Sequence, residues 1–120
     1  MIENNFQQIK TEQLNSISSG DKAFEKELIE IFLEQIPSFV LNIKAFFEKN
    51  DLARLAKEAH TAKSSALIFG LTHTGELLKE IQLQAEERKA EKLGELVERV
   101  VLELNDAEKQ LEKLLGTSND

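Results

Sequence analysis

The sequence predicts an all-α protein, an antiparallel four-helix bundle with an additional short N-terminal helix or arm. Residues that favour helix dominate its composition, with one proline and five glycines among 120 residues. Apolar residues recur every three or four positions over long segments, which is the period of one helix face. Short clusters of turn-forming residues separate these segments, and no strand-like alternation stands out. The length fits a single domain.

Residues 1–20 are predicted to form an N-terminal arm or short helix. They are mostly polar and end in SISSG, after which Asp21 is a candidate cap for the next helix. The segment offers four apolar residues for packing against the rest of the chain: Phe6, Ile9, Leu14 and Ile17.

A long helical pattern begins at Lys22. Its first part has two neighbouring apolar rows, one through residues 24, 28, 31 and 35 and one through residues 28, 32 and 36. Pro37 cannot donate the helical hydrogen bond, so it either kinks this helix or opens a new one at its first turn. A second apolar face follows, ends near EKND and is expected in the core: Phe39, Val40, Ile43, Phe46 and Phe47.

Three further helical segments complete the predicted bundle. Residues 52–69 carry the stripe Leu52, Leu55, Ala59, Ala62, Ala66 and Phe69. Gly70 ends this helix, and Thr72 or Thr74 can cap the next, which carries Leu77, Leu78, Ile81 and Ala85. The last helix is the most regular and is ended by Gly116; its stripe is Leu93, Val97, Val100, Leu104, Ala107, Leu111 and Leu114. The bundle is therefore predicted to span residues 21–116, with residues 117–120 as a disordered tail.

The composition argues against several classes of function. The 15 basic and 22 acidic residues give a net charge of −7, which disfavours a nucleic-acid ligand, because lysine and arginine bind phosphate backbones. The chain has no cysteine, which excludes disulfides, zinc–thiolate sites and thiol catalysis. No signal peptide or membrane-spanning run is recognisable. We expect a cytoplasmic protein without nucleic-acid or membrane partners, and a monomer, since the bundle can bury its own stripes.

His60 is predicted to face solvent. Successive helical residues are about 100° apart, so His60 lies roughly 140° from the centre of the apolar stripe of residues 52–69. Polar, small and bulky apolar side chains share this outward face: Ala56, Lys57, Lys63, Ser64, Leu67 and Ile68. Exposed apolar side chains beside a titratable group indicate a docking surface.

The residues around His60 suit the transfer of a phosphoryl group. A neutral imidazole is a good nucleophile near neutral pH. Lys63, about one helical turn away, can stabilise the charge on the transferring oxygens, and small neighbours leave room for a donor or an acceptor. The same residues also fit an ordinary surface histidine beside lysines, so the geometry alone leaves both interpretations open.

The other polar groups favour structural roles. His73 is expected at the start of the fourth helix, where a surface or capping role is favoured over a second phosphorylation site. A metal site joining His60 and His73 is not expected, because a helix break separates them and no carboxylate joins at ligand spacing. Ser64 and Ser65 have no nucleophile motif around them. Residues 86–89 are interpreted as a solvated charge cluster in a loop or at a helix end.

The stretch AHTAKSSALIFGL, residues 59–71, resembles the signature of histidine phosphotransfer (HPt) domains. That signature reads approximately A-H-x-φ-K-G-S-[SAG]-x-x-φ-G-[AL], where φ is an apolar residue. The matching positions are Ala59, His60, Lys63, Ser65, Ala66, Phe69, Gly70 and Leu71. The resemblance extends over about residues 20–110, since GDKAFEKELIEIFLEQIPSFV and GELLKEIQ look like the family's lead-in helix and the helix beside the active one.

The resemblance implies a four-helix phosphocarrier of a multistep His–Asp phosphorelay. His60 would accept a phosphoryl group from an aspartyl phosphate on a receiver domain and pass it to another receiver domain. Lys63 would be the cation beside it, and Gln82 would hydrogen-bond near the phosphoryl group. The partners would be receiver domains of response regulators or hybrid sensor kinases, chosen through the surface of Ala56, Lys57, Ser64, Leu67 and Ile68.

Such a carrier is not an enzyme and has no ATP-dependent kinase activity of its own. It needs no cofactor or metal in this chain, because the Mg²⁺ used in the transfer belongs to the receiver domain. Two alternatives stay open beside it. One is an HPt-like module that docks receiver domains without transfer. The other is a structural helical bundle with an unrelated partner, for which the long last helix offers a dimerisation surface.

Two positions depart from the signature. Ser64 replaces the usual glycine one turn after His60, where it either crowds the phosphoryl group or donates a hydrogen bond to it. Ala62 replaces a larger apolar residue, which predicts closer helix packing. Neither change removes a group that the transfer chemistry needs.

Overall fold

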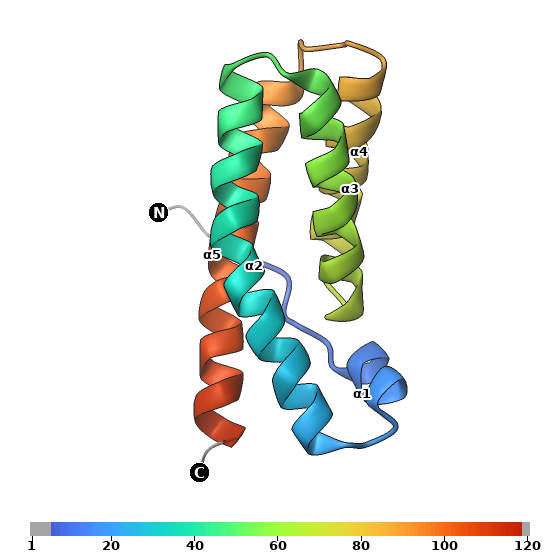
Figure 1. Cartoon of the computed structure of the whole chain (residues 1–120), viewed down its shortest axis with the longest axis vertical. Coiled ribbons are helices and arrows are strands. Elements are labelled where there is room, and N and C mark those ends of the chain that lie inside the picture. Colours follow the sequence, from blue (N-terminus) through green and yellow to red (C-terminus); the bar gives the residue numbers. More distant parts are fainter. Residues whose placement is uncertain (1–5, 119–120) are drawn as a thin grey trace.

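Five α-helices form the part of the chain that the computed structural model describes, residues 6–118. In chain order they are α1 (Glu12–Ser18), α2 (Lys22–Glu48), α3 (Leu52–Ile68), α4 (Thr72–Glu86) and α5 (Leu93–Ser118). No strand occurs within residues 6–118. The four long helices alternate in direction, and α1 packs against α2 (Figure 1). The predicted all-α four-helix bundle with a short N-terminal helix is confirmed.

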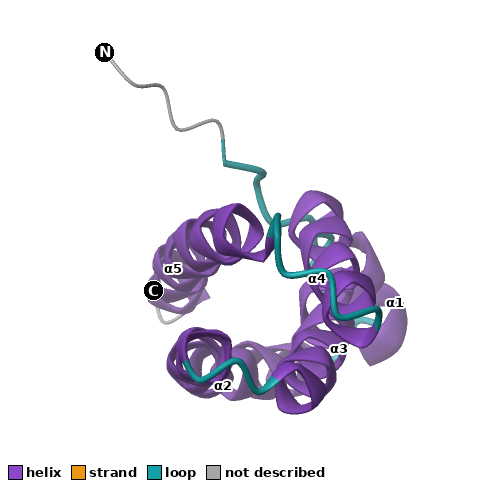
Figure 2. Cartoon of the chain, turned by 90° about the horizontal axis from the view of Figure 1, so that it is seen from above, coloured by secondary structure: helices purple, strands orange, loops and turns teal. Residues whose placement is uncertain are grey.

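The helices α2 to α5 form a ring in chain order, in which α5 packs back against α2 (Figure 2). The stripe predicted for α3 is buried from Leu55 onward, and the stripe of α5 is buried from Leu93 to Leu111. Leu52 and Leu114, at the ends of these stripes, are partly buried against the same core. The helical period therefore identified correctly which sides of α3 and α5 face inward.

Pro37 bends α2 without ending it. The helix runs unbroken for 27 residues and changes direction midway along its length (Figure 1). Phe24 is 38% exposed and Ile31 is 50% exposed, so the apolar row predicted through these two residues is wrong. The first half of α2 extends past the end of α3, and the short helix α1 lies beside it there (Figure 1). The buried row is instead Ile29, Phe32, Ile36, Phe39 and Ile43.

The start of α2 is capped as predicted, but the start of α4 is not. Asp21 Oδ1 accepts a hydrogen bond from the backbone N–H of Phe24 at 3.1 Å. Neither predicted threonine caps α4, because the hydroxyl of Thr74 donates inward to a buried carboxylate of α5. Gln7 takes this role instead: its Oε1 accepts from the backbone N–H of His73 at 2.7 Å. Its Nε2 also donates to the hydroxyl of Thr72 at 2.8 Å.

The segment before α1 forms hydrogen bonds with the turn between α3 and α4 and with α5. The backbone N–H of Lys10 donates to the carbonyl of Phe69 at 2.9 Å. On the other side, Gln110 of α5 accepts from the N–H of Ile9 at 2.8 Å. Leu14 of α1 is buried in the core, whereas Ile17 is exposed. Residues 1–5 of the predicted N-terminal arm lie outside the described residues.

The helix α5 does not end at Gly116, as had been predicted, but continues to Ser118. A glycine lowers helix propensity by only about 1 kcal/mol relative to alanine. That cost does not stop a helix whose preceding turns pack on the bundle through Leu111 and Leu114. Residues 117 and 118 of the predicted disordered tail are therefore helical, and residues 119 and 120 lie outside the described residues.

Candidate phosphotransfer site

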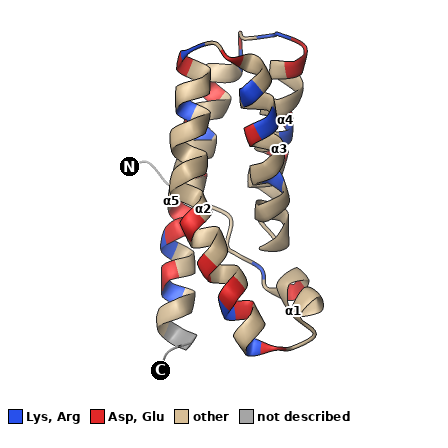
Figure 3. Cartoon of the chain, viewed as in Figure 1, with Lys and Arg blue, Asp and Glu red and all other residues tan. Residues whose placement is uncertain are grey.

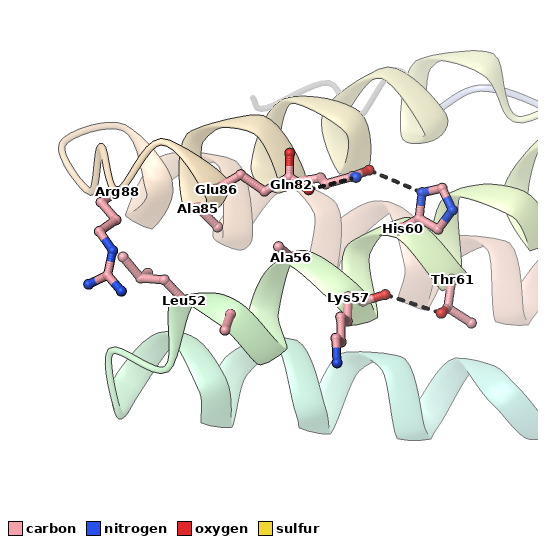
Figure 4. Close-up of a pocket in the computed structure, with 10 residues that line it drawn as sticks. Leu52, Ala56, Lys57, His60, Thr61, Gln82, Ala85, Glu86 and Arg88 are labelled. Atoms are coloured by element: carbon pink, nitrogen blue, oxygen red, sulfur yellow. Dashed lines mark hydrogen bonds between the residues drawn. The ribbon is translucent and has the colours of Figure 1, made fainter.

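A pocket of about 600 Å³ opens between α3 and α4, with His60 on its wall (Figure 4). The helix α3 contributes Ala56, Lys57 and Thr61, and α4 contributes Gln82, Ala85 and Glu86. The two helices are neighbours in the ring, so residues from distant positions in the sequence line one pocket. The site is open to solvent, and His60 is exposed as predicted.

Gln82 holds one ring nitrogen of His60. Its Oε1 lies 3.2 Å from His60 Nδ1, and its Nε2 lies 3.1 Å from Glu86 Oε2. The other ring nitrogen, Nε2, lies on the side of the ring away from Gln82 (Figure 4). The structure thus brings Gln82, which the resemblance had placed near the phosphoryl group, into contact with His60 itself. It leaves one nitrogen of the imidazole accessible to a partner.

Lys63 lies one turn after His60 and does not line the pocket. Its side chain passes close to α4, since a Cβ built on Gly75 would lie 3.9 Å from Lys63 Cγ. Among the described residues Lys63 makes no ion pair, so its ammonium group is available to an incoming anion.

Ser64 directs its hydroxyl at its own helix. Its Oγ lies 3.5 Å from the carbonyl oxygen of His60, the acceptor one turn earlier in α3. A hydroxyl in this position neither points at the imidazole nor occupies the pocket. The next residue, Ser65, faces the other neighbour and donates to Gln35 Oε1 of α2 at 3.0 Å.

Three of the four further residues predicted for the docking surface reach solvent. Lys57 is exposed, Leu67 is 43% exposed and Ile68 is half-buried. Ala56 is 6% exposed, so its predicted place on the outward face is wrong. A small residue beside the core stripe lies in the contact between α3 and α4, where it helps to form the base of the pocket.

The helix that carries His60 is basic, although the chain is acidic. The α3 segment contains Arg54, Lys57 and Lys63 against the single acidic residue Glu58. The first half of α2 carries a cluster of acidic residues, as Figure 3 shows. The local charge beside His60 is therefore suited to a negatively charged partner or group.

Glu86 is a polar residue of the site that the sequence did not predict there. It ends α4, in agreement with its interpretation as part of a helix-end charge cluster, but it also hydrogen-bonds Gln82. The spacing of four residues between Gln82 and Glu86 places both side chains on one helix face. The spacing alone predicts a contact between Gln82 and Glu86. It points to the site only once His60 is known to be the other partner of Gln82.

Comparison with known proteins identifies the family. The family model described as "Hpt domain" matches residues 27–116, three quarters of the chain. The chain belongs to the Hpt domain family. The match includes His60, Lys63 and Gln82, and it leaves α1 and the segment before it outside.

A curated relative of this Hpt domain is the phosphorelay intermediate protein YPD1 of Candida albicans. The two are 26% identical over 70 residues, which are 58% of this chain and 38% of the relative. The match thus covers well under half of the length of that protein.

Two solved structures share the fold. The histidine-containing phosphotransfer protein B (HptB) of Pseudomonas aeruginosa aligns with a TM-score of 0.80 at 16% identity, over 88% of this chain and 91% of that one. The HPT domain of a sensor hybrid histidine kinase of Shewanella aligns with a TM-score of 0.80 at 18% identity, over 91% and 94%. Within the described residues, no helix is long and apolar enough to span a membrane.

Proposed function

We propose that this Hpt domain is a phosphocarrier in which His60 receives a phosphoryl group from an aspartyl phosphate and passes it to another receiver domain. The observation that carries the proposal is the exposed imidazole of His60, which Gln82 engages at Nδ1 while Nε2 stays accessible. Membership of the Hpt family and the similarity to a phosphorelay intermediate support the same role.

The transfer needs one nucleophilic nitrogen and one leaving carboxylate. The lone pair of His60 Nε2 forms a bond to phosphorus, and the bond between phosphorus and the aspartyl oxygen breaks. Its electron pair leaves on the carboxylate of the receiver. In the second half of the relay, a carboxylate of another receiver attacks the phosphorus, and the electron pair of the N–P bond returns to Nε2. The carrier is unchanged after both steps.

Residues on both sides of His60 support this chemistry in distinct ways. Lys63 supplies a positive charge one turn away, which offsets the negative charge of the phosphoryl oxygens. The exposed Lys57 and Leu67 and the half-buried Ile68 form the surface on which a receiver domain docks, while the buried Ala56 lines the pocket. Mg²⁺ is contributed by the receiver domain, and ATP takes no part in the step.

The decisive experiment is phosphoryl transfer from a ³²P-labelled receiver domain. The wild-type chain should take up label that is labile in acid and stable in base, and His60→Gln should take up none. His73→Gln is the matched control, because it removes the only other histidine and should keep the uptake. Label on the His60→Gln chain would contradict the proposal.

Docking without transfer would instead support the alternative of a module that binds receiver domains but carries no phosphoryl group. Binding of the unphosphorylated receiver, measured by titration calorimetry, separates the two, since both predict binding and only one predicts uptake. We further propose that the chain acts as a monomer. Light scattering after size exclusion should give the mass of one chain, about 13.6 kDa.

A further inference from the structure

The Gln82 amide is held at both ends, and its two ends are chemically different. Its oxygen can only accept hydrogen bonds, and its NH₂ group can only donate them. One end lies 3.1 Å from a carboxylate oxygen of Glu86, and the other lies 3.2 Å from His60 Nδ1. An ionised carboxylate only accepts, so the NH₂ group must face Glu86. The amide oxygen must then face His60.

The orientation of the amide decides which nitrogen of His60 carries the proton. An imidazole that meets an acceptor at Nδ1 must donate from Nδ1, so its single proton lies there and the lone pair lies on Nε2. The reverse arrangement would place the amide oxygen against the carboxylate, two acceptors at hydrogen-bonding distance with no proton between them. In water, by contrast, a free histidine side chain favours the proton on Nε2.

We propose that Glu86 is a positioning residue that fixes the reactive tautomer of His60 through Gln82. This inference rests on the proposed phosphocarrier function. Glu86 touches neither the phosphoryl group nor the ring, and acts by orienting the amide that does contact the ring. The Nδ1–H tautomer is the competent one, because its Nε2 lone pair can attack phosphorus. The Nε2–H tautomer has no lone pair on the accessible nitrogen.

The same arrangement fits the ring after transfer. Formation of the N–P bond at Nε2 leaves the proton on Nδ1 and gives the ring a positive charge. The Nδ1–H group then donates to Gln82 Oε1 as a charge-assisted hydrogen bond, which is stronger than the neutral one. When the phosphoryl group leaves with its receiver, the electron pair returns to Nε2 and the ring is neutral in the same tautomer. No proton has to move in either direction.

The chain supplies a matched control for Glu86 on the same helix. Glu80 accepts a hydrogen bond from Gln84 at 2.8 Å, so it forms a glutamine–glutamate pair of the same spacing. Glu80 and Gln84 do not line the pocket. Substitution of Glu80 changes the charge of α4 by the same amount as substitution of Glu86, but it leaves the amide beside His60 untouched.

The experiment reads the tautomer directly, by long-range ¹H–¹⁵N correlation NMR of His60 at about pH 8.5, where a histidine is neutral. The wild-type chain and Glu80→Lys should show the proton on Nδ1. Glu86→Lys should move it to Nε2, because an ammonium group only donates, turns the amide oxygen away from the ring and presents its NH₂ group to Nδ1. Both variants lie on exposed positions and should stay folded.

The transfer rate provides the second readout. It should fall in Glu86→Lys in proportion to the remaining Nδ1–H population, about tenfold if one tenth remains. In Glu80→Lys the rate should stay within about twofold of wild type. In a Gln82→Leu background, Glu86→Lys should change neither the tautomer nor the rate relative to Gln82→Leu alone, since the connecting amide is gone.

Two results would overturn the role of Glu86: a wild-type His60 with its proton on Nε2, or a Glu86→Lys chain with the wild-type tautomer. Both can be observed without any receiver domain. Failure of the proposed function would appear elsewhere, as label uptake that survives His60→Gln. The two failures are therefore distinguishable.

Discussion

Ser64 occupies a position where the signature has glycine, and its side chain leaves the space around His60 open. The Hpt signature has glycine there, and a larger residue could crowd the phosphoryl group. In this chain the hydroxyl lies 3.5 Å from the backbone carbonyl of His60 and away from the ring. A serine that bonds back to the preceding turn is compatible with a helix and keeps the imidazole free.

Ser64→Gly should therefore leave the transfer rate within about twofold of wild type while lowering stability. Glycine is about 0.5 kcal/mol less favourable than serine inside a helix. Urea denaturation should show this loss, and label transfer from a phosphorylated receiver should show the unchanged rate. A rate that rises severalfold would mean that the hydroxyl hinders the phosphoryl group after all.

Lys63 is the residue whose charge should matter most after His60 itself. Its ammonium group makes no ion pair within the described part of the chain and lies one turn from the imidazole. Lys63→Ala should slow transfer by roughly tenfold, because one cation beside the transferring oxygens is lost. The circular dichroism spectrum should be unchanged. Lys44→Ala, on the other side of the bundle, is a control for net charge, and an equal effect of both variants would contradict a local role.

At the scale of elements, the turn between α3 and α4 depends on a single glycine. Gly70 has a φ of +70°, a conformation that residues with a Cβ rarely adopt. A Cβ at this position would also lie 2.6 Å from Lys10 Cβ and 3.0 Å from the carbonyl oxygen of Lys10. Both the turn between α3 and α4 and the close contact of Lys10 with this turn therefore require glycine at position 70.

Gly70→Ala should lower the free energy of unfolding by roughly 2–4 kcal/mol, the sum of backbone strain and a collision with backbone that cannot move freely. Gly20→Ala separates the two causes. Gly20 also has a positive φ, +83°, but nothing lies within 4 Å of its Cβ position. The Gly20→Ala variant should therefore lose only about 1 kcal/mol of the free energy of unfolding. Equal losses in urea denaturation would show that the collision at Gly70 is relieved.

At the scale of the whole molecule, one buried carboxylate connects α4 and α5. Glu103 is 4% exposed and accepts hydrogen bonds from Thr74 Oγ1 at 2.7 Å and from Arg99 Nε at 2.8 Å. His73 Nδ1 lies 2.8 Å from the same carboxylate. His73 is exposed, as predicted, and its side chain serves this contact between helices. Arg99 in turn lies over the ring of Phe6, 5.1 Å from its centre, so the N-terminal segment joins the same cluster.

Glu103→Leu should lower the free energy of unfolding by roughly 3 kcal/mol, because it leaves partners of a buried charge unpaired. The double variant Glu103→Leu/Thr74→Val should recover about 1 kcal/mol of this loss, since the buried hydroxyl without a partner is also removed. Thermal and urea denaturation of both chains test the expectation. A double variant less stable than Glu103→Leu would contradict it.

Much of this architecture follows from the helical period. The predicted apolar stripes of α3 and α5 are buried from Leu55 onward and from Leu93 to Leu111, because both helices pack on the core through these faces. The prediction failed for the first turns of α2, at Phe24 and Ile31, because this part of the helix extends beyond α3. Periodicity identifies a face, but how far a neighbour covers that face depends on where the neighbour ends.

The sequence by itself determined the helical bundle and the outward position of His60, and the resemblance to the family placed Gln82 near the phosphoryl group. Only the tertiary structure decided that Gln7 caps α4, that Ala56 is buried and that the amide hydrogen-bonded to Glu86 lies beside the imidazole. The Gln7 cap and the burial of Ala56 depend on contacts between different segments of the chain, and the local Gln82–Glu86 pair acquires its role only through the contact of Gln82 with His60 of α3. Local periodicity contains no information on such contacts, because the distance and the rotation between packed helices are set by the whole core.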